Sequence, residues 1–252
     1  MAPNFGRSIS FPLTPATSFS KSSRYVRSDT AAAGSSLAPG LTALHALHAA
    51  LAGVLLLPES RAALRCTTSN AADCLLDVFL LLADAHQGFQ ECLISLRHAT
   101  AESRAALRRG RDATRLASAA RSQRRTEKDL ARLAASVSTV SSKCTRQNLV
   151  GEDAEMAGAI VQAAAASAAA SAAVFSAAAS MSSPASSCKK MAMFIPTFAT
   201  RKVAAPEIAE AAMERLFAQE RCFDECDDPC DMVFRSVLQT RVSLLNIMTP
   251  VI

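Results

Sequence analysis

Three cysteines recur at every fourth residue near the carboxyl end of the chain, at Cys222, Cys226 and Cys230. Thiolates bind zinc and iron–sulfur clusters, but those sites usually contain closer pairs such as C-x-x-C or a distant second pair. The acidic residues between these cysteines raise thiol pKa values and lack the central glycine of a calcium-binding loop. The spacing therefore favours cysteines that share one helix face over a metal or redox site, and no cofactor is expected.

The histidines offer little sign of catalysis. His45 and His48 are neighbours on an expected helix, but no cysteine or acidic residue accompanies them nearby. The chain also lacks the H-E-x-x-H, G-x-S-x-G, Walker and G-x-G-x-x-G motifs. A catalytic triad can assemble in space from distant residues, so an enzyme stays an alternative, but a non-enzymatic protein is the favoured interpretation.

Charge is distributed unevenly along the chain. Residues 97–132 contain eleven Lys and Arg against four acidic residues, whereas residues 205–235 contain nine acidic residues against three Arg. These segments are expected to be solvated helix faces that attract each other across a bundle. The alternative is a surface for an anionic membrane, where each basic side chain gains about 1 kcal/mol. Nucleic-acid binding is not expected, because the arginines belong to no recognisable reading module. The candidate contacts to an anionic surface are Arg104, Arg108, Arg109, Arg111, Arg115, Arg121, Arg124 and Arg125.

The amino-terminal stretch RSISFP places Arg7 three residues before Ser10 and Pro12 two residues after it. This spacing suits a basophilic kinase and has the form of a 14-3-3 docking motif, in which phosphorylation adds about −2 charge units. A phosphoserine-binding adaptor is therefore one candidate among protein partners that the sequence does not identify. Residues 1–28 also contain four basic residues, seven serines and no acidic residue. That composition is typical of a transit peptide, so chloroplast import stays open beside a cytoplasmic location.

The elements that must position these residues are expected to be helices. Residues 1–40 are rich in Ser, Thr, Pro and Ala and show no apolar period, so a disordered tail is expected there. Residues 41–252 are expected to form a single all-α domain, a bundle of long antiparallel helices, because no stretch alternates like a strand. The expected helices lie at 41–57, 71–109, 112–140, 152–181 and 206–248, with a loop from Pro58 to Asn70, a stop at Gly110 and an interruption at Asp228-Pro229.

The segment 157–181 has no charged residue and is long enough to span a bilayer. Fourteen of its residues are Ala and four are Ser, whereas membrane insertion is driven chiefly by Leu, Ile, Phe and Val. Small side chains permit close helix–helix approach. A buried helix of a soluble bundle is therefore favoured, and a membrane-embedded helix is the alternative.

The carboxyl-terminal segment 233–250 has the pattern of an amphipathic helix. Its expected core stripe consists of Val233/Phe234, Val237/Leu238, Leu244/Leu245 and Met248. As a string, Phe234-Arg235, Leu238 and TRVSLLNI at 240–247 resemble the ending of the plant BYPASS-like family. RSISFP is similar to the RSISLP-like opening of that family, and Cys74-Leu75-Leu76-Asp77 is similar to its L-L-D helix.

The resemblance covers about residues 5–250. It implies an all-helical plant protein linked to root and shoot development, with no known enzyme activity and no agreed catalytic residues, so no site can be carried over. The alanine-rich 152–181 segment departs from the bulkier residues of the family. The sequence thus predicts a non-enzymatic regulatory or scaffold protein. The alternatives are a peripheral membrane-associated factor that docks through a basic helix and an organelle-imported factor.

Overall fold

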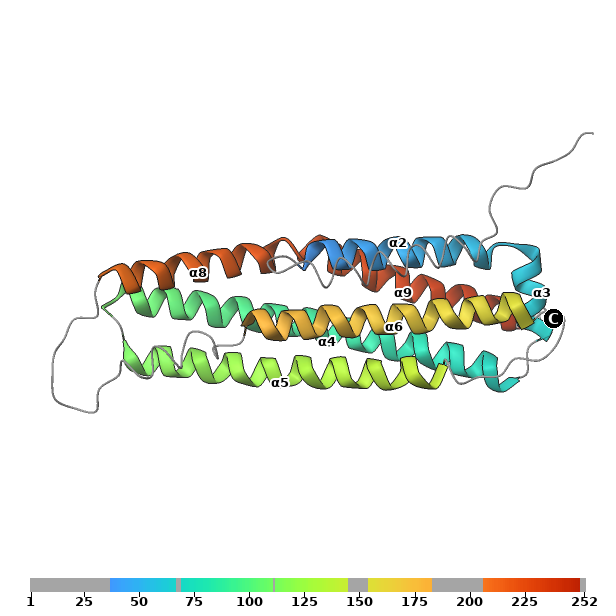
Figure 1. Cartoon of the computed structure of the whole chain (residues 1–252), viewed down its shortest axis with the longest axis horizontal. Helices are drawn as coiled ribbons and strands as arrows, with labels where there is room; N and C mark the ends of the chain where they lie inside the picture. Colours follow the sequence, from blue (N-terminus) through green and yellow to red (C-terminus); the bar gives the residue numbers. More distant parts are fainter. Residues whose placement is uncertain (1–36, 67–68, 111, 145–153, 183–205, 250–252) are drawn as a thin grey trace, which may run out of the picture.

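The computed structural model describes residues 37–66, 69–110, 112–144, 154–182 and 206–249. Within these residues the chain forms helices and no strand, which confirms the all-α prediction. The helices pack side by side as an elongated bundle (Figure 1). They are α2 (Ala38–Leu55), α3 (Pro58–Cys66), α4 (Ser69–Arg108), α5 (Ala113–Cys144), α6 (Ala154–Ser182), α8 (Pro206–Asp224) and α9 (Asp227–Met248).

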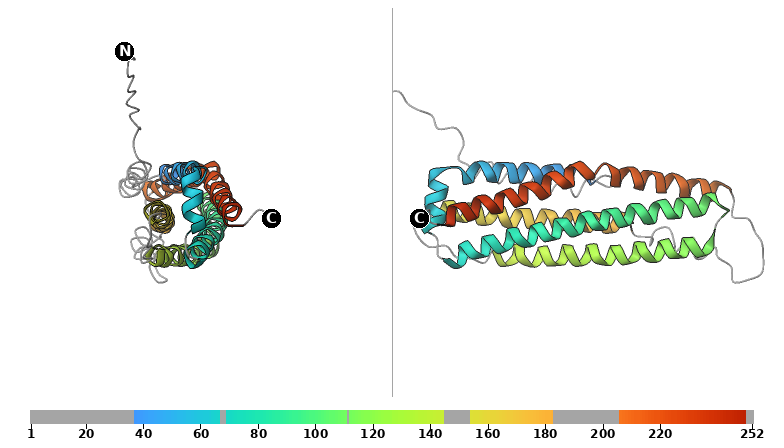
Figure 2. Two further views of the ribbon diagram at one scale, coloured as in Figure 1. Left: turned by 90° about the vertical axis from the view of Figure 1, so that its right-hand side faces the viewer. Right: turned by 180° about the vertical axis from the view of Figure 1, so that it is seen from behind.

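Helix α4 is the longest element and lies against most of the others. It packs against α5, α6, α8 and α9, and α6 in turn packs against α5 and α2. Helices α8 and α2 follow one another along one edge of the bundle (Figure 1). From behind, α9 and α4 run side by side (Figure 2), in agreement with their extensive mutual contacts. Helices α8 and α2, each about half as long as α4, together cover the length that α4 spans alone.

The core consists of the apolar stripes that the 3.6-residue period predicts. Leu41, Leu44, Leu47 and Leu51 of α2 are all buried. The buried stripe of α4 includes Leu75, Phe79, Leu82, Phe89, Leu93 and Leu96. Helix α6 contributes mainly alanines, together with the buried side chains of Ile160, Val161, Val174 and Phe175. Among them Phe175 stacks on Phe89, with ring centroids 4.7 Å apart.

The turn between α4 and α5 forms as predicted. Gly110 has φ +88°, a left-handed conformation that glycine adopts without steric cost. Asp112 then caps α5, because its Oδ1 accepts hydrogen bonds from the backbone N–H groups of Thr114 at 3.1 Å and Arg115 at 3.2 Å. These two residues reverse the chain and set α5 antiparallel to α4.

The expected loop from Pro58 to Asn70 is wrong over most of its length, because residues 58–66 form helix α3. Pro58 occupies the first helical position and Glu59 the first turn, both of which favour a helix start. Ala63 and Leu64 are buried against the bundle. The first helix also begins at Ala38, within the segment expected to be a tail.

The interruption in the last helical region lies earlier than expected. Helix α8 ends at Asp224 and α9 begins at Asp227, so Pro229 already belongs to the first turn of α9. A proline lacks the N–H that would bond to the carbonyl four residues before it and its ring crowds that carbonyl, which here belongs to Glu225. The break therefore falls at residues 225–226, and the flanking residue is Cys226, without a side-chain cap. Asp228 is not the capping residue.

The expected core stripe of α9 is correct for only part of its residues. Val233, Val237 and Leu244 are buried, but Leu238 and Leu245 are 39% and 36% exposed. Their places in the core are taken by the other buried residues of α9, which are Cys230, Thr240 and Ile247. Helix α5 also extends to Cys144, four residues beyond the expected end.

Candidate functional site

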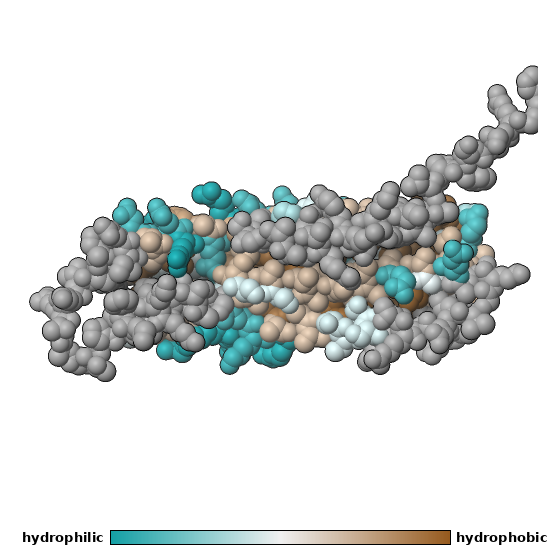
Figure 3. Space-filling view, viewed as in Figure 1, coloured by the Kyte–Doolittle hydropathy of each residue, from teal (hydrophilic) through white to brown (hydrophobic). Residues whose placement is uncertain are grey.

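Helix α5 carries a basic stripe on its outer face. Its core-facing side includes Ala119, Leu130 and Val137, which are fully buried. At 100° per residue, the basic residues lie on the opposite side of the helix, and all of them are exposed. Hydrophilic side chains accordingly gather along α5 in the surface view (Figure 3). We call this set the α5 stripe; it consists of Arg121, Arg124, Arg125, Lys128 and Arg132.

The other arginines predicted to contact an anionic surface lie near the α4–α5 turn, in different surroundings. Arg104 pairs with Glu220 of α8, and its guanidinium carbon lies 4.7 Å from the centroid of the Phe217 ring. Arg108 lies over the same ring at 5.6 Å. Arg109 is exposed, Arg115 pairs with its own helix cap Asp112 at 3.4 Å, and Arg111 lies outside the described residues. The structure therefore brings Arg121, Arg124 and Arg125 onto one face and turns Arg104 toward α8.

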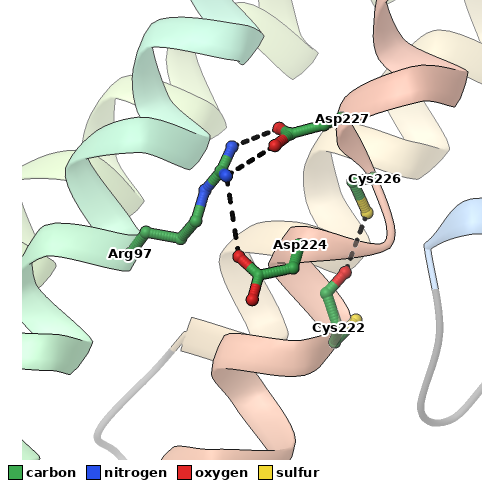
Figure 4. Close-up of polar contacts among 5 residues, drawn as sticks. All are labelled: Arg97, Cys222, Asp224, Cys226 and Asp227. Atoms are coloured by element: carbon green, nitrogen blue, oxygen red, sulfur yellow. Dashed lines mark hydrogen bonds and ion pairs between the residues drawn. The ribbon is translucent and has the colours of Figure 1, made fainter.

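Ion pairs join the basic and acidic segments at the point where α8 meets α9. Arg97 of α4 donates to Asp227 at 2.6 Å and lies 3.6 Å from Asp224 (Figure 4). These contacts raise the pKa of Arg97, chiefly through its hydrogen bond to Asp227. Together with the pair of Arg104 and Glu220, they confirm the predicted attraction between the two segments.

The three cysteines lie inside this joint and are buried, as the helix-face interpretation predicts. The thiol of Cys226 donates to the carbonyl oxygen of Cys222 at 3.1 Å (Figure 4). Hydrogen bonding between the two thiols raises the pKa of Cys226 and lowers that of Cys222, whereas burial raises the pKa of Cys230 to about 12. In the described part of the chain, no group of three His, Cys, Asp or Glu side chains could hold a metal ion.

Two buried histidines form polar contacts that the sequence did not predict. His48 Nε2 lies 2.8 Å from Ser167 Oγ, and His86 Nε2 lies 2.9 Å from Ser171 Oγ. The two serines are one helical turn apart on α6. Ser167 attaches α6 to α2 through His48, and Ser171 attaches it to α4 through His86. Burial lowers the pKa of His48 to about 3 and that of His86 to about 4. The histidines are therefore neutral near pH 7. Their hydrogen bonds fix the position of α6 along α2 and α4.

Two open grooves on the described surface lie between long helices. One, of about 530 Å³, lies between α5 and α6 and is lined by alanines and serines. The other, of about 650 Å³, lies between α4 and the α8–α9 joint, where Arg97, His98 and Asp227 are among its lining residues. Neither groove contains the buried histidines. The phosphorylation motif of Arg7, Ser10 and Pro12 lies outside the described residues.

Two described helices are long and apolar enough to cross a membrane by length and composition alone, Ala38–Leu55 and Glu155–Ser182. Half or more of the relevant window of each is buried inside the bundle. Core helices of soluble proteins have the same properties, so this finding is compatible with the buried α6 that the alanine content favours.

Comparison with known proteins identifies the family. The sequence model of the family described as Protein BPS1 matches residues 40–247, which is most of the chain and nearly all of the described bundle. No curated protein and no solved structure matches the chain significantly. The match confirms the resemblance to BYPASS-like proteins and extends from α2 to the end of α9. The chain therefore belongs to the Protein BPS1 family.

Proposed function

We propose that this protein is a non-enzymatic regulatory or scaffold protein that acts by binding other proteins. The observation that carries the proposal is the distribution of polar groups in the described bundle. Its interior is predominantly apolar with a few buried His, Ser and Thr side chains, and none of its described charged residues is buried. The buried polar pairs of His48 with Ser167 and His86 with Ser171 are enclosed by the core and line neither of the two grooves described above. Family membership supports a regulatory role.

The process in which we place this regulation is root and shoot development, as the resemblance to BYPASS-like proteins implies. Plants that lack the protein are expected to show altered root and shoot growth, and the wild-type gene is expected to restore it. Normal growth of the mutant plants in both organs would contradict this part of the proposal.

The partner proposed for the RSISFP stretch is a phosphoserine-binding adaptor. A pull-down from plant extract, with and without phosphatase treatment, tests it. The adaptor is expected to be lost after phosphatase treatment and in the Ser10→Ala variant, because the phosphate charge is what a basic groove recognises. Ser20→Ala is the matched control and is expected to retain the adaptor. Retention by Ser10→Ala would remove this partner from the proposal.

A second candidate function, peripheral association with an anionic membrane, is favoured by the α5 stripe. Each basic side chain near such a surface contributes about 1 kcal/mol. The combined change Arg121→Ala, Arg125→Ala and Arg132→Ala is therefore expected to weaken binding to phosphatidylserine vesicles by roughly a hundredfold. Sedimentation with vesicles measures the effect, and phosphatidylcholine vesicles provide the uncharged comparison.

A charge-matched control separates the stripe from net charge. Arg61, Arg221 and Arg235 are also exposed but lie on α3, α8 and α9. Replacing these three arginines with alanine changes the net charge equally and is expected to leave vesicle binding nearly unchanged. Equal losses in the two triple variants, or no vesicle binding by the wild type at low salt, would contradict membrane docking through the α5 stripe.

A further inference from the structure

The face that α4 and α9 form together exposes large apolar side chains. Nine large hydrophobic residues are substantially exposed in the described part of the chain, and five of them lie on this face, where Ile94 is 62% and Val242 53% exposed. None of the nine lies on α5 or α6. We call these five residues the α4–α9 seam; they are Leu80, Ile94, Leu238, Val242 and Leu245. Clustered exposed apolar residues mark interaction sites more often than single ones do.

The register of the two helices aligns these side chains. Arg97 faces Asp227 and Arg104 faces Glu220, so a step along α4 corresponds to an equal step in the opposite direction along α8 and α9. By this register Leu80 lies level with Leu244 and Leu245, and Ile94 lies level with Cys230. Seen from behind, the two helices lie beside each other along this length (Figure 2). By this register Leu80, Leu238, Val242 and Leu245 gather at one end of the line between α4 and α9, and Ile94 lies farther along it.

A groove continues this line at the α8–α9 joint. Ile94 of the seam is one of the residues that line the cavity of about 650 Å³. Leu93, Ala101 and Cys230 supply further apolar lining, and Arg97 and Asp227 supply polar groups. A large side chain of a ligand that lies along the seam can enter this groove at its end.

Acidic residues follow the outer side of α4 next to the seam. Asp77, Asp84 and Glu91 are spaced seven residues apart and are exposed. Seven residues correspond to nearly two helical turns, so the three carboxylates form one row. None of them forms an ion pair with a described residue. The seam therefore has a negatively charged border whose charge is not neutralised within the described bundle.

We propose that the α4–α9 seam binds an amphipathic helix of a partner protein, with apolar side chains toward the seam and Lys or Arg along its α4 edge. The proposal rests on the scaffold function proposed above and assigns it a surface. From Leu80 to Ile94 the seam extends about 20 Å at 1.5 Å per residue, which matches about four turns of a partner helix. Apolar packing supplies the affinity, and charge along the edge supplies the orientation.

Two synthetic helices test the proposal. Both carry leucine at heptad positions a and d; one carries lysine at e and g and the other glutamate. Fluorescence anisotropy with the full chain is expected to show at least tenfold tighter binding of the lysine peptide. Replacing Asp84 and Glu91 with lysine is expected to reverse this preference. Circular dichroism confirms that each variant retains its helices.

Apolar variants locate the binding surface. The double change Leu238→Asp and Leu245→Asp is expected to weaken binding of the lysine peptide at least tenfold. The control Leu56→Asp changes a residue that is 77% exposed in the turn after α2, and it is expected to bind the peptide as the wild type does. Leu238, Leu245 and Leu56 are all exposed, so neither the double variant nor the control is expected to unfold the bundle.

Four results would overturn the inference. Equal binding of the two peptides, or binding that survives the Leu238 and Leu245 changes, would show that the seam is not a basic-helix site. A dimer of this chain that the same changes dissociate, measured by light scattering, would assign the seam to a second copy instead. If the seam variants retain the protein partners recovered by pull-down, the scaffold function stands while the seam loses its role.

Discussion

His48 and His86 are ionisable residues held uncharged inside an apolar core. Each shares a hydrogen bond with a serine of α6 through Nε2, while the Nδ1 atoms are buried without a partner in the described structure. A protonated ring would place a charge and an unsatisfied N–H among phenylalanine and alanine side chains. Burial therefore lowers both pKa values below the ordinary 6.5, and His45 and His86 lower the pKa of His48 further by charge repulsion.

This linkage predicts a pH dependence of stability. The unfolded chain binds protons near pH 6.5, whereas folded His48 binds them only near 3 and folded His86 near 4. The stabilisation is fully present above pH 6.5 and declines as the pH falls toward 4, by up to about 1.4 kcal/mol per histidine for each pH unit. Urea unfolding at pH 7 and pH 5 measures it. His48→Gln with His86→Gln is the control, and an equal loss in that variant would contradict the assignment.

Phe175 provides a second test at single-residue scale. Its side chain is fully buried, stacks on Phe89 and touches the His86 ring edge-on. Phe175→Ala leaves a cavity and is expected to lower the free energy of unfolding by about 3–5 kcal/mol. Phe217→Ala, at a site 40% exposed, is the matched control and is expected to cost far less. Denaturant unfolding compares them, and similar losses would show that the core around α6 is not packed as described.

At the scale of elements, two glycines should respond to alanine in opposite directions. Gly110 has φ +88°, so Gly110→Ala is strained and is expected to destabilise the α4–α5 turn by about 1 kcal/mol. Gly158 lies within α6, and an added Cβ there meets nothing within 4 Å. Gly158→Ala is therefore expected to stabilise the protein by about 0.5–1 kcal/mol. Thermal unfolding measures both changes, and shifts of the same sign would contradict the expectation.

The long helices could be predicted from sequence because their apolar residues recur over many turns and Gly110 and Asp112 mark an unambiguous boundary. Helix α3 could not, because nine residues are too few to establish a period. Helix α3 instead depends on burial of Ala63 and Leu64 against elements that are distant in the sequence. At Gly88 an added Cβ would lie 3.3 Å from the Leu133 side chain of α5. That close approach between helices is a tertiary property that local propensity does not contain.

The candidate site shows the same limit. The shared face of Arg121, Arg124 and Arg125 follows from helical spacing, and charge segregation predicted the contact of α4 with the acidic segment. The pairing of Arg104 with Glu220, however, depends on the register between α4 and α8, because the two residues lie 116 positions apart in the chain. His48 and Ser167 are 119 residues apart and His86 and Ser171 are 85 apart. No local pattern can reveal such pairs.

At the scale of the whole molecule, the first and last described helices pack against each other. Helix α9 lies along α2, and Arg65 Nε of α3 donates to the carbonyl oxygen of Ile247 at 3.1 Å. Deleting residues 227–252 is therefore expected to uncover apolar surface of α2 and α4 and to yield aggregated protein in gel filtration. Deleting residues 1–36, a similar length, is the control and is expected to leave the bundle folded. A soluble, fully helical chain without α9 would contradict this prediction.

The pairing of α2 with α9 also has a consequence for synthesis. Ribosomes add about 5–20 residues per second, so α9 is complete roughly 10–40 s after α2. Helices α4, α5 and α6 can pair with their neighbours as they appear, because each contacts the next in the chain. The side of α2 that α9 covers stays exposed throughout this interval and is open to chaperones. Only a chain that already includes α9 can conceal it, so burial of this side of α2 requires that translation has passed the end of α9.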